Sequence, residues 1–147
     1  MILSSKRYRM RQQKIVIKND PKALKTLRNK LKSFLVKSDF PKKDQWHFLM
    51  AVGEACTNSM AHSYGKDVKG SIRVSAMEFK DKIVFNIRDY GEKINLKKIK
   101  SPKLPPKKPH GLGIYFLKTI MDELKYNTTH PKGNELTLIK YKPRMSR

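Results

Sequence analysis

The run GEACTNSMAH, residues 53–62, follows an amphipathic segment from about Asp44 and predicts the second half of one helix. Polar residues Glu54, Asn58 and His62 recur at steps of four on one side of this helix, flanked by alanines. A carboxylate and an amide above small residues indicate a ligand site, although the same spacing also suits a solvated helix face. Apolar residues at steps of three and four predict the opposite, buried stripe: Leu49, Val52, Cys56 and Met60.

The charge of the chain favours polyanionic partners. Its 147 residues carry 34 Lys and Arg against 12 Asp and Glu, a formal net charge of +22. Hydrophobic residues make up 38%, with enough periodicity for one folded domain. The single cysteine, Cys56, fits a reducing compartment, and no run approaches the roughly 20 apolar residues of a membrane span. We therefore expect a cytoplasmic protein with no membrane segment.

The pattern along the chain predicts an α+β fold. We expect a two-layer sandwich in which helices cover a mixed, mostly antiparallel sheet. Basic tails at residues 1–13 and 143–147 flank a domain over residues 14–142, and a loop rich in Lys and Pro interrupts it at about 92–110. The expected elements are a strand at 14–18, helices at 23–35 and 44–62, a hairpin at 71–79 and 82–89, a helix from 111 through Leu124 and a strand at 135–141.

Two further motifs follow the helix. Asp89-Tyr90-Gly91 ends a strand whose alternation places Asp89 on the core side. Taken alone, this motif favours a simple turn. The functional alternative is a buried carboxylate that accepts a hydrogen bond from the exocyclic amine of adenine. Gly111-Leu112-Gly113 opens a predicted helix. The motif suits a flexible helix entry, and it also suits a phosphate site, because backbone N–H groups at a helix N-terminus favour anions. The loop between these motifs holds seven lysines and four prolines, which is typical of a functional lid.

In this order the motifs resemble the ATP-binding domain of gyrase, heat-shock chaperones, histidine kinases and mismatch-repair proteins, the Bergerat or GHKL fold. Within that superfamily the chain is most similar to bacterial anti-sigma-factor serine/threonine-protein kinases. The similarity covers about residues 14–142. Its motifs are EACTN at 54–58 with trailing AHSY at 61–64, GLGI at 111–114 and LKTIMDE at 117–123.

The resemblance implies a role for each matching residue. Glu54 would be the catalytic base and Asn58 the Mg²⁺ ligand, while Asp89 and Gly91 would hold adenine. The polar residue that the family usually places near adenine, a threonine, is replaced by Asn134. The segment Gly111-Leu112-Gly113 would bind the phosphates of ATP.

The implied function is partner switching. A protein of this group binds a sigma factor and phosphorylates a serine or threonine of an antagonist with the sulfate-transporter/anti-sigma-antagonist fold, and it is commonly a homodimer. Two alternatives remain open: a nucleotide-gated binding module that transfers little phosphate, and a basic nucleic-acid-binding protein, motivated by charge alone. We expect nucleic acid not to be the primary partner, because no stacking pattern of aromatic residues follows the basic runs.

Overall fold

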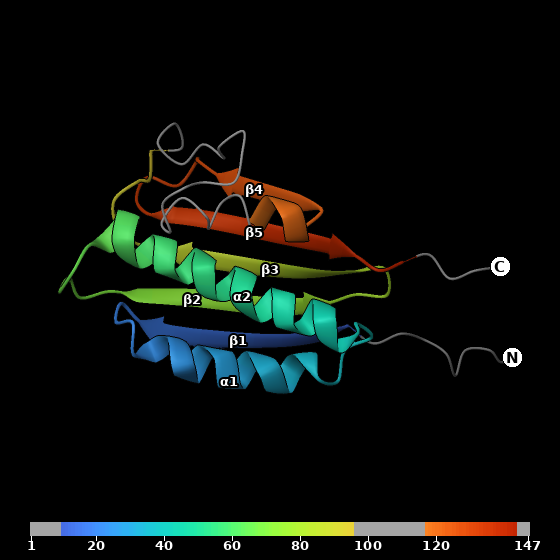
Figure 1. Cartoon of the computed structure of the whole chain (residues 1–147). Helices are drawn as coiled ribbons and strands as arrows, with labels where there is room; N and C mark the ends of the chain where they lie inside the picture. Colours follow the sequence, from blue (N-terminus) through green and yellow to red (C-terminus); the bar gives the residue numbers. More distant parts are fainter. Residues whose placement is uncertain (1–9, 96–116, 144–147) are drawn as a thin grey trace, which may run out of the picture.

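The strands form one sheet, shown in Figure 1. The computed structural model describes residues 10–95 and 117–143. Within them the strand order is β1-β2-β3-β5-β4, and every neighbouring pair is antiparallel. The sheet is therefore antiparallel throughout its described part rather than mixed. Its strands are β1 Arg11–Lys18, β2 Ser71–Glu78, β3 Lys82–Asp89, β4 Glu123–Asn127 and β5 Asn134–Tyr141.

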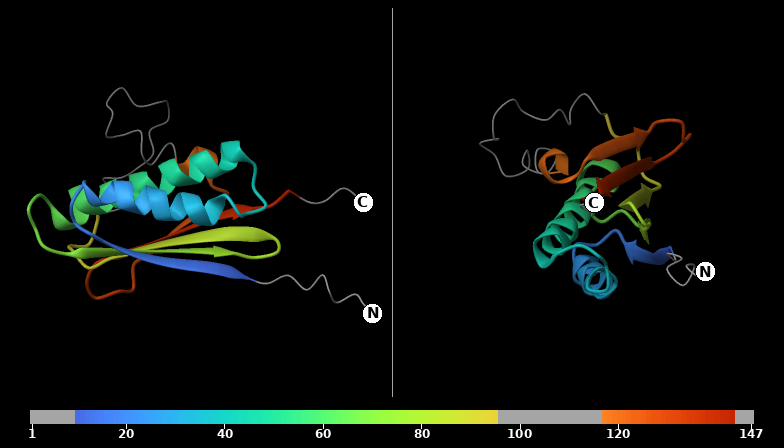
Figure 2. Two further views of the ribbon diagram at one scale, coloured as in Figure 1. Left: turned by 90° about the horizontal axis from the view of Figure 1, so that it is seen from below. Right: turned by 90° about the vertical axis from the view of Figure 1, so that its right-hand side faces the viewer.

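The long helices α1 (Ala23–Leu35) and α2 (Lys42–Asn58) lie on one face of this sheet, as the views in Figure 2 show. We call the face toward the helices the inner face and the opposite one the outer face. Because side chains alternate along a strand, β2 points Ile72, Val74 and Ala76 into the core and its odd-numbered residues outward. The predicted two-layer α+β sandwich is confirmed. In the described part of the chain, no helix is long and apolar enough to cross a membrane.

The predicted helix over residues 44–62 changes character at its end. The α-helical part stops at Asn58, and Ser59–Tyr64 continues as a π-helix that ends at Gly65 with φ 86°. The wider turn brings Ser63 into a buried position, whereas His62 is exposed. Periodicity of 3.6 residues does not reveal a π-turn, and such turns are frequent at functional sites.

The C-terminal helix ends earlier than predicted. In the described residues it spans only 117–120, and the chain then enters β4, so Leu124 lies in a strand. There it pairs in register with Leu138 of β5. The apolar spacing suits either state, and pairing with β5 decides between them. At the other end, β1 begins at Arg11, so residues 11–13 belong to the sheet rather than to the tail.

A buried ion cluster closes the end of the sheet away from the Asp89-Tyr90-Gly91 motif. Glu78 is 1% exposed, and its Oε1 lies 2.6 Å from Nη1 of Arg11. Its Oε2 accepts the Asp39 backbone N–H at 2.9 Å and lies 3.1 Å from Nζ of Lys142. The guanidinium of Arg11 also donates to the Phe34 carbonyl at 2.7 Å. One carboxylate therefore joins β2 to β1, to the segment between the two helices and to the end of the chain.

Candidate functional site

Asp89 ends β3 on the inner face and is 1% exposed. Its Oδ1 accepts hydrogen bonds from Ser63 Oγ at 2.6 Å, Gly91 N at 3.3 Å, and Asn134 N and Nδ2 at 3.1 and 3.0 Å. No donor within the described residues contacts Oδ2. The protein thus holds one carboxylate oxygen, and a ligand's hydrogen-bond donor can use the other.

Asn134 lies directly opposite Asp89 in the β3–β5 register. Its Nδ2 is also within 3.1 Å of Ser63 Oγ and 2.8 Å of the Glu92 carbonyl, and its Oδ1 accepts the Ile94 N–H at 2.8 Å. The structure thus engages Asn134 in holding Asp89 and the segment that follows β3. Sequence reasoning missed the part of Ser63 in this cluster, because only the π-turn carries its hydroxyl to the carboxylate.

Gly91 is required by close packing against the π-helix. A Cβ added there would lie 2.5 Å from both the carbonyl oxygen and Oγ of Ser63. The next residue, Glu92, donates its N–H to the same Ser63 carbonyl at 2.8 Å. The resemblance implied that Gly91 helps to hold adenine, and the structure adds that its backbone lies against Ser63.

Replacing Gly91 by alanine is expected to lower the free energy of unfolding by about 1–3 kcal/mol, because the new methyl group must displace backbone atoms. The matched control is Gly53→Ala, since a Cβ at Gly53 of α2 meets no atom within 4 Å. That change is expected to raise stability by about 0.5–1 kcal/mol, as alanine favours helix. Thermal unfolding of both variants measures the difference. Equal stabilities would contradict the packing described for Gly91.

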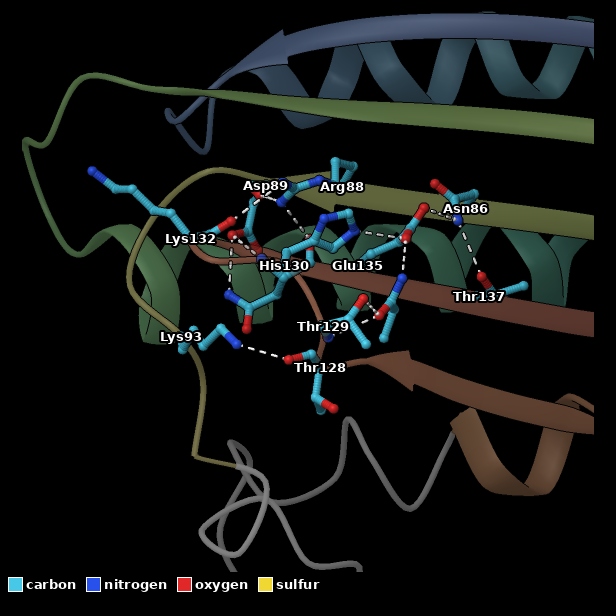
Figure 3. A network of polar contacts seen from close by, with 12 residues as sticks. Asn86, Arg88, Asp89, Lys93, Thr128, Thr129, His130, Lys132, Glu135 and Thr137 are labelled. Carbon is cyan, nitrogen blue, oxygen red and sulfur yellow. Dashed lines mark hydrogen bonds and ion pairs between the residues drawn. The ribbon is translucent and has the colours of Figure 1, made fainter.

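A second polar network adjoins the Asp89 cluster and appears in Figure 3. Lys93 Nζ donates to the Thr128 carbonyl at 2.8 Å, which ties the segment after Gly91 to the β4–β5 loop. Glu135 accepts Asn86 Nδ2 at 3.0 Å and lies 2.9 Å from His130 Nε2. The hydrogen bond from His130 is the largest of the contacts that lower the pKa of Glu135. The Lys93–Thr128 and His130–Glu135 contacts together hold the β4–β5 loop beside the end of β3.

Glu54 and Asn58 lie one turn apart near the end of α2, as predicted. Glu54 is partly exposed, whereas Asn58 is 8% exposed and its Nδ2 is buried without a hydrogen-bond partner. A buried amide N–H without a partner costs free energy that a ligand could recover. The amide oxygen of the same side chain is the type of hard ligand that Mg²⁺ prefers.

The surroundings of Asp89 keep neighbouring acids protonated. Burial raises the pKa of the Cys56 thiol to about 12, and the charge of Asp89 contributes to that shift. Burial likewise raises the pKa of the Tyr126 hydroxyl to about 12, again with a smaller effect of Asp89. Cys56 is therefore a neutral core residue.

The segment Gly111-Leu112-Gly113 and most of the predicted lid lie outside the described residues. Among the described residues, no group of three or more His, Cys, Asp or Glu side chains could hold a metal ion by itself. A metal ion at Asn58 would therefore need the phosphates of a nucleotide and water molecules as its other ligands.

The family model for the histidine kinase-like ATPase domain matches residues 17–140. This match covers most of the chain, and the protein therefore belongs to the histidine kinase-like ATPase domain family.

Several curated relatives share one printed name, serine-protein kinase RsbW. The one from Bacillus velezensis is 32% identical over 101 residues, which cover 63% of this chain and 61% of that protein. The one from Bacillus mycoides is 32% identical over 111 residues, covering 69% of this chain and 67% of the relative. The relative from Bacillus subtilis is 30% identical over 101 residues, covering 63% of this chain and 61% of the relative. The matched part thus spans about three fifths of the length of most of these proteins.

Solved structures agree on the fold. The RsbU and RsbW domains of Rv1364c from Mycobacterium tuberculosis match with a TM-score of 0.66 at 19% identity, over 90% of this chain and 33% of that one. The histidine kinase domain of the blue-light activated histidine kinase EL346 from Erythrobacter litoralis matches with a TM-score of 0.53 at 13% identity, over 82% of this chain and 59% of that one. At these identities the likeness concerns the arrangement of helices and sheet.

Proposed function

We propose that the protein is an ATP-dependent anti-sigma factor that binds a sigma factor and phosphorylates a serine or threonine of its antagonist. The observation that supports a nucleotide site is the unequal use of the two Asp89 carboxylate oxygens. Oδ1 accepts four hydrogen bonds from the protein, whereas no donor in the described residues contacts Oδ2. The kinase activity rests on the relatives named serine-protein kinase. Both partners, a homodimeric state and a cytoplasmic location are part of the same proposal.

Adenine recognition follows from the chemistry of Asp89. A carboxylate oxygen without a protein donor, on a side chain that is only 1% exposed, favours a ligand that brings an N–H group, and the exocyclic amine of adenine is such a group. The four donors on Oδ1 fix the orientation of the carboxylate and hold it in place. In this proposal Asn134 and Gly91 act through Asp89 and the backbone around it, and they help to shape the adenine site.

Phosphoryl transfer requires positioning and charge neutralisation more than covalent chemistry by the protein. Asn58 would offer its amide oxygen to Mg²⁺, which when bound neutralises the charge of the phosphates. Glu54, partly exposed one turn earlier, would orient the hydroxyl of the target residue and accept its proton. Gly111, Leu112 and Gly113 would offer backbone N–H groups to the phosphates.

Replacing Glu54 by glutamine is expected to lower phosphate transfer by at least about 100-fold, because the amide cannot accept the proton. ATP affinity should stay within about threefold of wild type, since Glu54 does not bind the base or the phosphates in this proposal. The measurement incubates the purified protein with labelled ATP, Mg²⁺ and each antagonist-fold protein of the same genome, while ATP binding is followed separately by calorimetry. A matched control is Asp44→Asn, which removes a carboxylate at the opposite end of α2.

The outcomes separate the open alternatives. Transfer to a serine or threonine that is lost in Glu54→Gln and kept in Asp44→Asn supports the kinase and identifies the antagonist. ATP binding without transfer to any candidate contradicts the kinase and favours the nucleotide-gated binding module. Absence of ATP binding contradicts the whole assignment of the site.

A further inference from the structure

The outer face of the sheet is strongly basic on one half. No described helix covers this face, as the edge-on view of Figure 2 shows. Strands β1, β2 and β3 direct no carboxylate to it. The cations that they direct to it by strand alternation are Lys14, Lys18, Arg73, Lys82 and Arg88. Among the described strands, the carboxylates directed to the outer face are Glu123 of β4 and Glu135 of β5.

Two arginines face each other directly across β2 and β3. The register pairs Arg73 with Arg88, and like charges directly opposite in a sheet destabilise it. Arg88 donates to the carbonyl groups of Asp89, Lys132 and Asn134. Arg73 is exposed and makes no hydrogen bond or ion pair with any described residue. The positive charge of Arg73 is therefore not compensated by an ion pair within the described residues.

The carboxylate that could balance the charge of Arg88 is bonded to other residues. Glu135 lies directly opposite Arg88 in the β3–β5 register. Its Oε2 accepts Asn86 Nδ2 at 3.0 Å, and its Oε1 contacts Asn127 Nδ2 at 3.1 Å and His130 Nε2 at 2.9 Å. This network is visible in Figure 3. Engaged in this way, Glu135 forms no ion pair with Arg88 among the described contacts.

An exposed aromatic ring lies beside the two arginines. Tyr90 follows Asp89 and is 40% exposed. The guanidinium carbon of Arg88 lies 4.3 Å from the ring centroid, and that of Arg73 lies 6.0 Å from it. The backbone of Tyr90 is held by a hydrogen bond from its N–H to the Tyr64 hydroxyl at 2.8 Å. The ring is therefore presented on a rigid element among cations.

We propose that this half of the outer face binds single-stranded nucleic acid, with phosphates at Lys14, Lys18 and Arg73 and a base on Tyr90. Such sites combine cations that follow the phosphate backbone with an aromatic ring on which a base stacks. A protein partner would need apolar anchors in the centre of the surface. Around the Arg73–Arg88 pair this face presents charged and polar groups, apart from the exposed Val16 on the edge strand β1. The other apolar residues of this face, Met77, Val84 and Ile139, are neighbours in the register and lie four residues further along the strands. The site is separate from the inner-face nucleotide site and does not depend on the proposed kinase activity.

The test is the binding of fluorescein-labelled oligothymidylate and oligouridylate of about 20 nucleotides, followed by fluorescence anisotropy at several salt concentrations. Arg73→Gln is expected to weaken binding and to reduce the salt slope by about 0.7, the value for one phosphate contact on a single strand. Tyr90→Leu is expected to weaken binding at least about fivefold with an unchanged salt slope, because stacking releases no counterions. Excess Mg-ATP should not displace the oligonucleotide.

The charge-matched control is Arg28→Gln, on the exposed side of α1, across the molecule from this face. It should leave both affinity and salt slope unchanged. Equal losses in Arg73→Gln and Arg28→Gln would overturn the proposal in favour of attraction by net charge alone. Absent binding, tighter binding of a duplex, or displacement by Mg-ATP would overturn it as well. Thermal unfolding of Arg73→Gln should show no loss of stability, so misfolding cannot account for its effect.

Discussion

Replacing Asp89 by asparagine is expected to reverse the preference of the protein between adenine and hypoxanthine nucleotides. The donors from Ser63, Gly91 and Asn134 on Oδ1 require that the new side chain place its oxygen there. Its amide nitrogen then takes the place of Oδ2 and meets the amine of adenine donor to donor. ATP affinity should fall by at least about 100-fold, since buried polar groups that oppose each other are left unpaired.

The same substitution should improve binding of ITP, whose base carries a carbonyl oxygen where adenine has its amine. The measurement is a calorimetric titration of wild type and Asp89→Asn with Mg-ATP and Mg-ITP, beside a thermal unfolding curve to verify the fold. Asp81→Asn, in the turn before β3, serves as the control for loss of one carboxylate. A uniform loss of both nucleotides in a folded variant would contradict direct contact between Asp89 and the base.

Replacing Glu78 by glutamine is expected to lower the free energy of unfolding by about 3 kcal/mol. The carboxylate is 1% exposed and pairs with Arg11 at 2.6 Å and Lys142 at 3.1 Å. Breaking a buried ion pair by removing one partner leaves the remaining charges desolvated and uncompensated. For a domain of this size the unfolding midpoint should fall by about 10 °C.

The control for this change is the same substitution at Glu54, which is partly exposed and forms no ion pair with the described residues. Glu54→Gln should leave the midpoint within about 2 °C of wild type, as expected for a surface change. Thermal unfolding followed by circular dichroism measures both variants. Equal midpoints for Glu78→Gln and Glu54→Gln would show that the cluster does not contribute to stability.

Much of the candidate site could be predicted from local patterns. The spacing of Glu54 and Asn58 placed them one turn apart, and the alternation of β3 placed Asp89 on the core side. The hairpin of β2 and β3 followed from two alternating runs and a short turn. These features depend on residues that are neighbours in the sequence, so their periodicity reports the structure directly.

Contacts between distant residues could not be predicted in the same way. Ser63 and Asn134 are 71 residues apart, and both meet at Asp89 only because the π-turn and the β3–β5 register bring them together. The strand β4 was missed for a related reason, since Leu124 suits a helix by spacing and joins the sheet through its pairing with Leu138. Roles for Gly111, Leu112 and Gly113 stay predictions.

By itself the sequence determined the two-layer α+β class, the helix that carries Glu54 and Asn58, and the high positive charge, because each depends on composition or on local periodicity. Only the tertiary structure decided that one oxygen of Asp89 is saturated and the other has no described donor. It alone also decided that Arg73 and Arg88 face each other without a carboxylate between them. Hydrogen bonds and charge compensation depend on distances between residues far apart in the chain, and the packed sheet sets those distances.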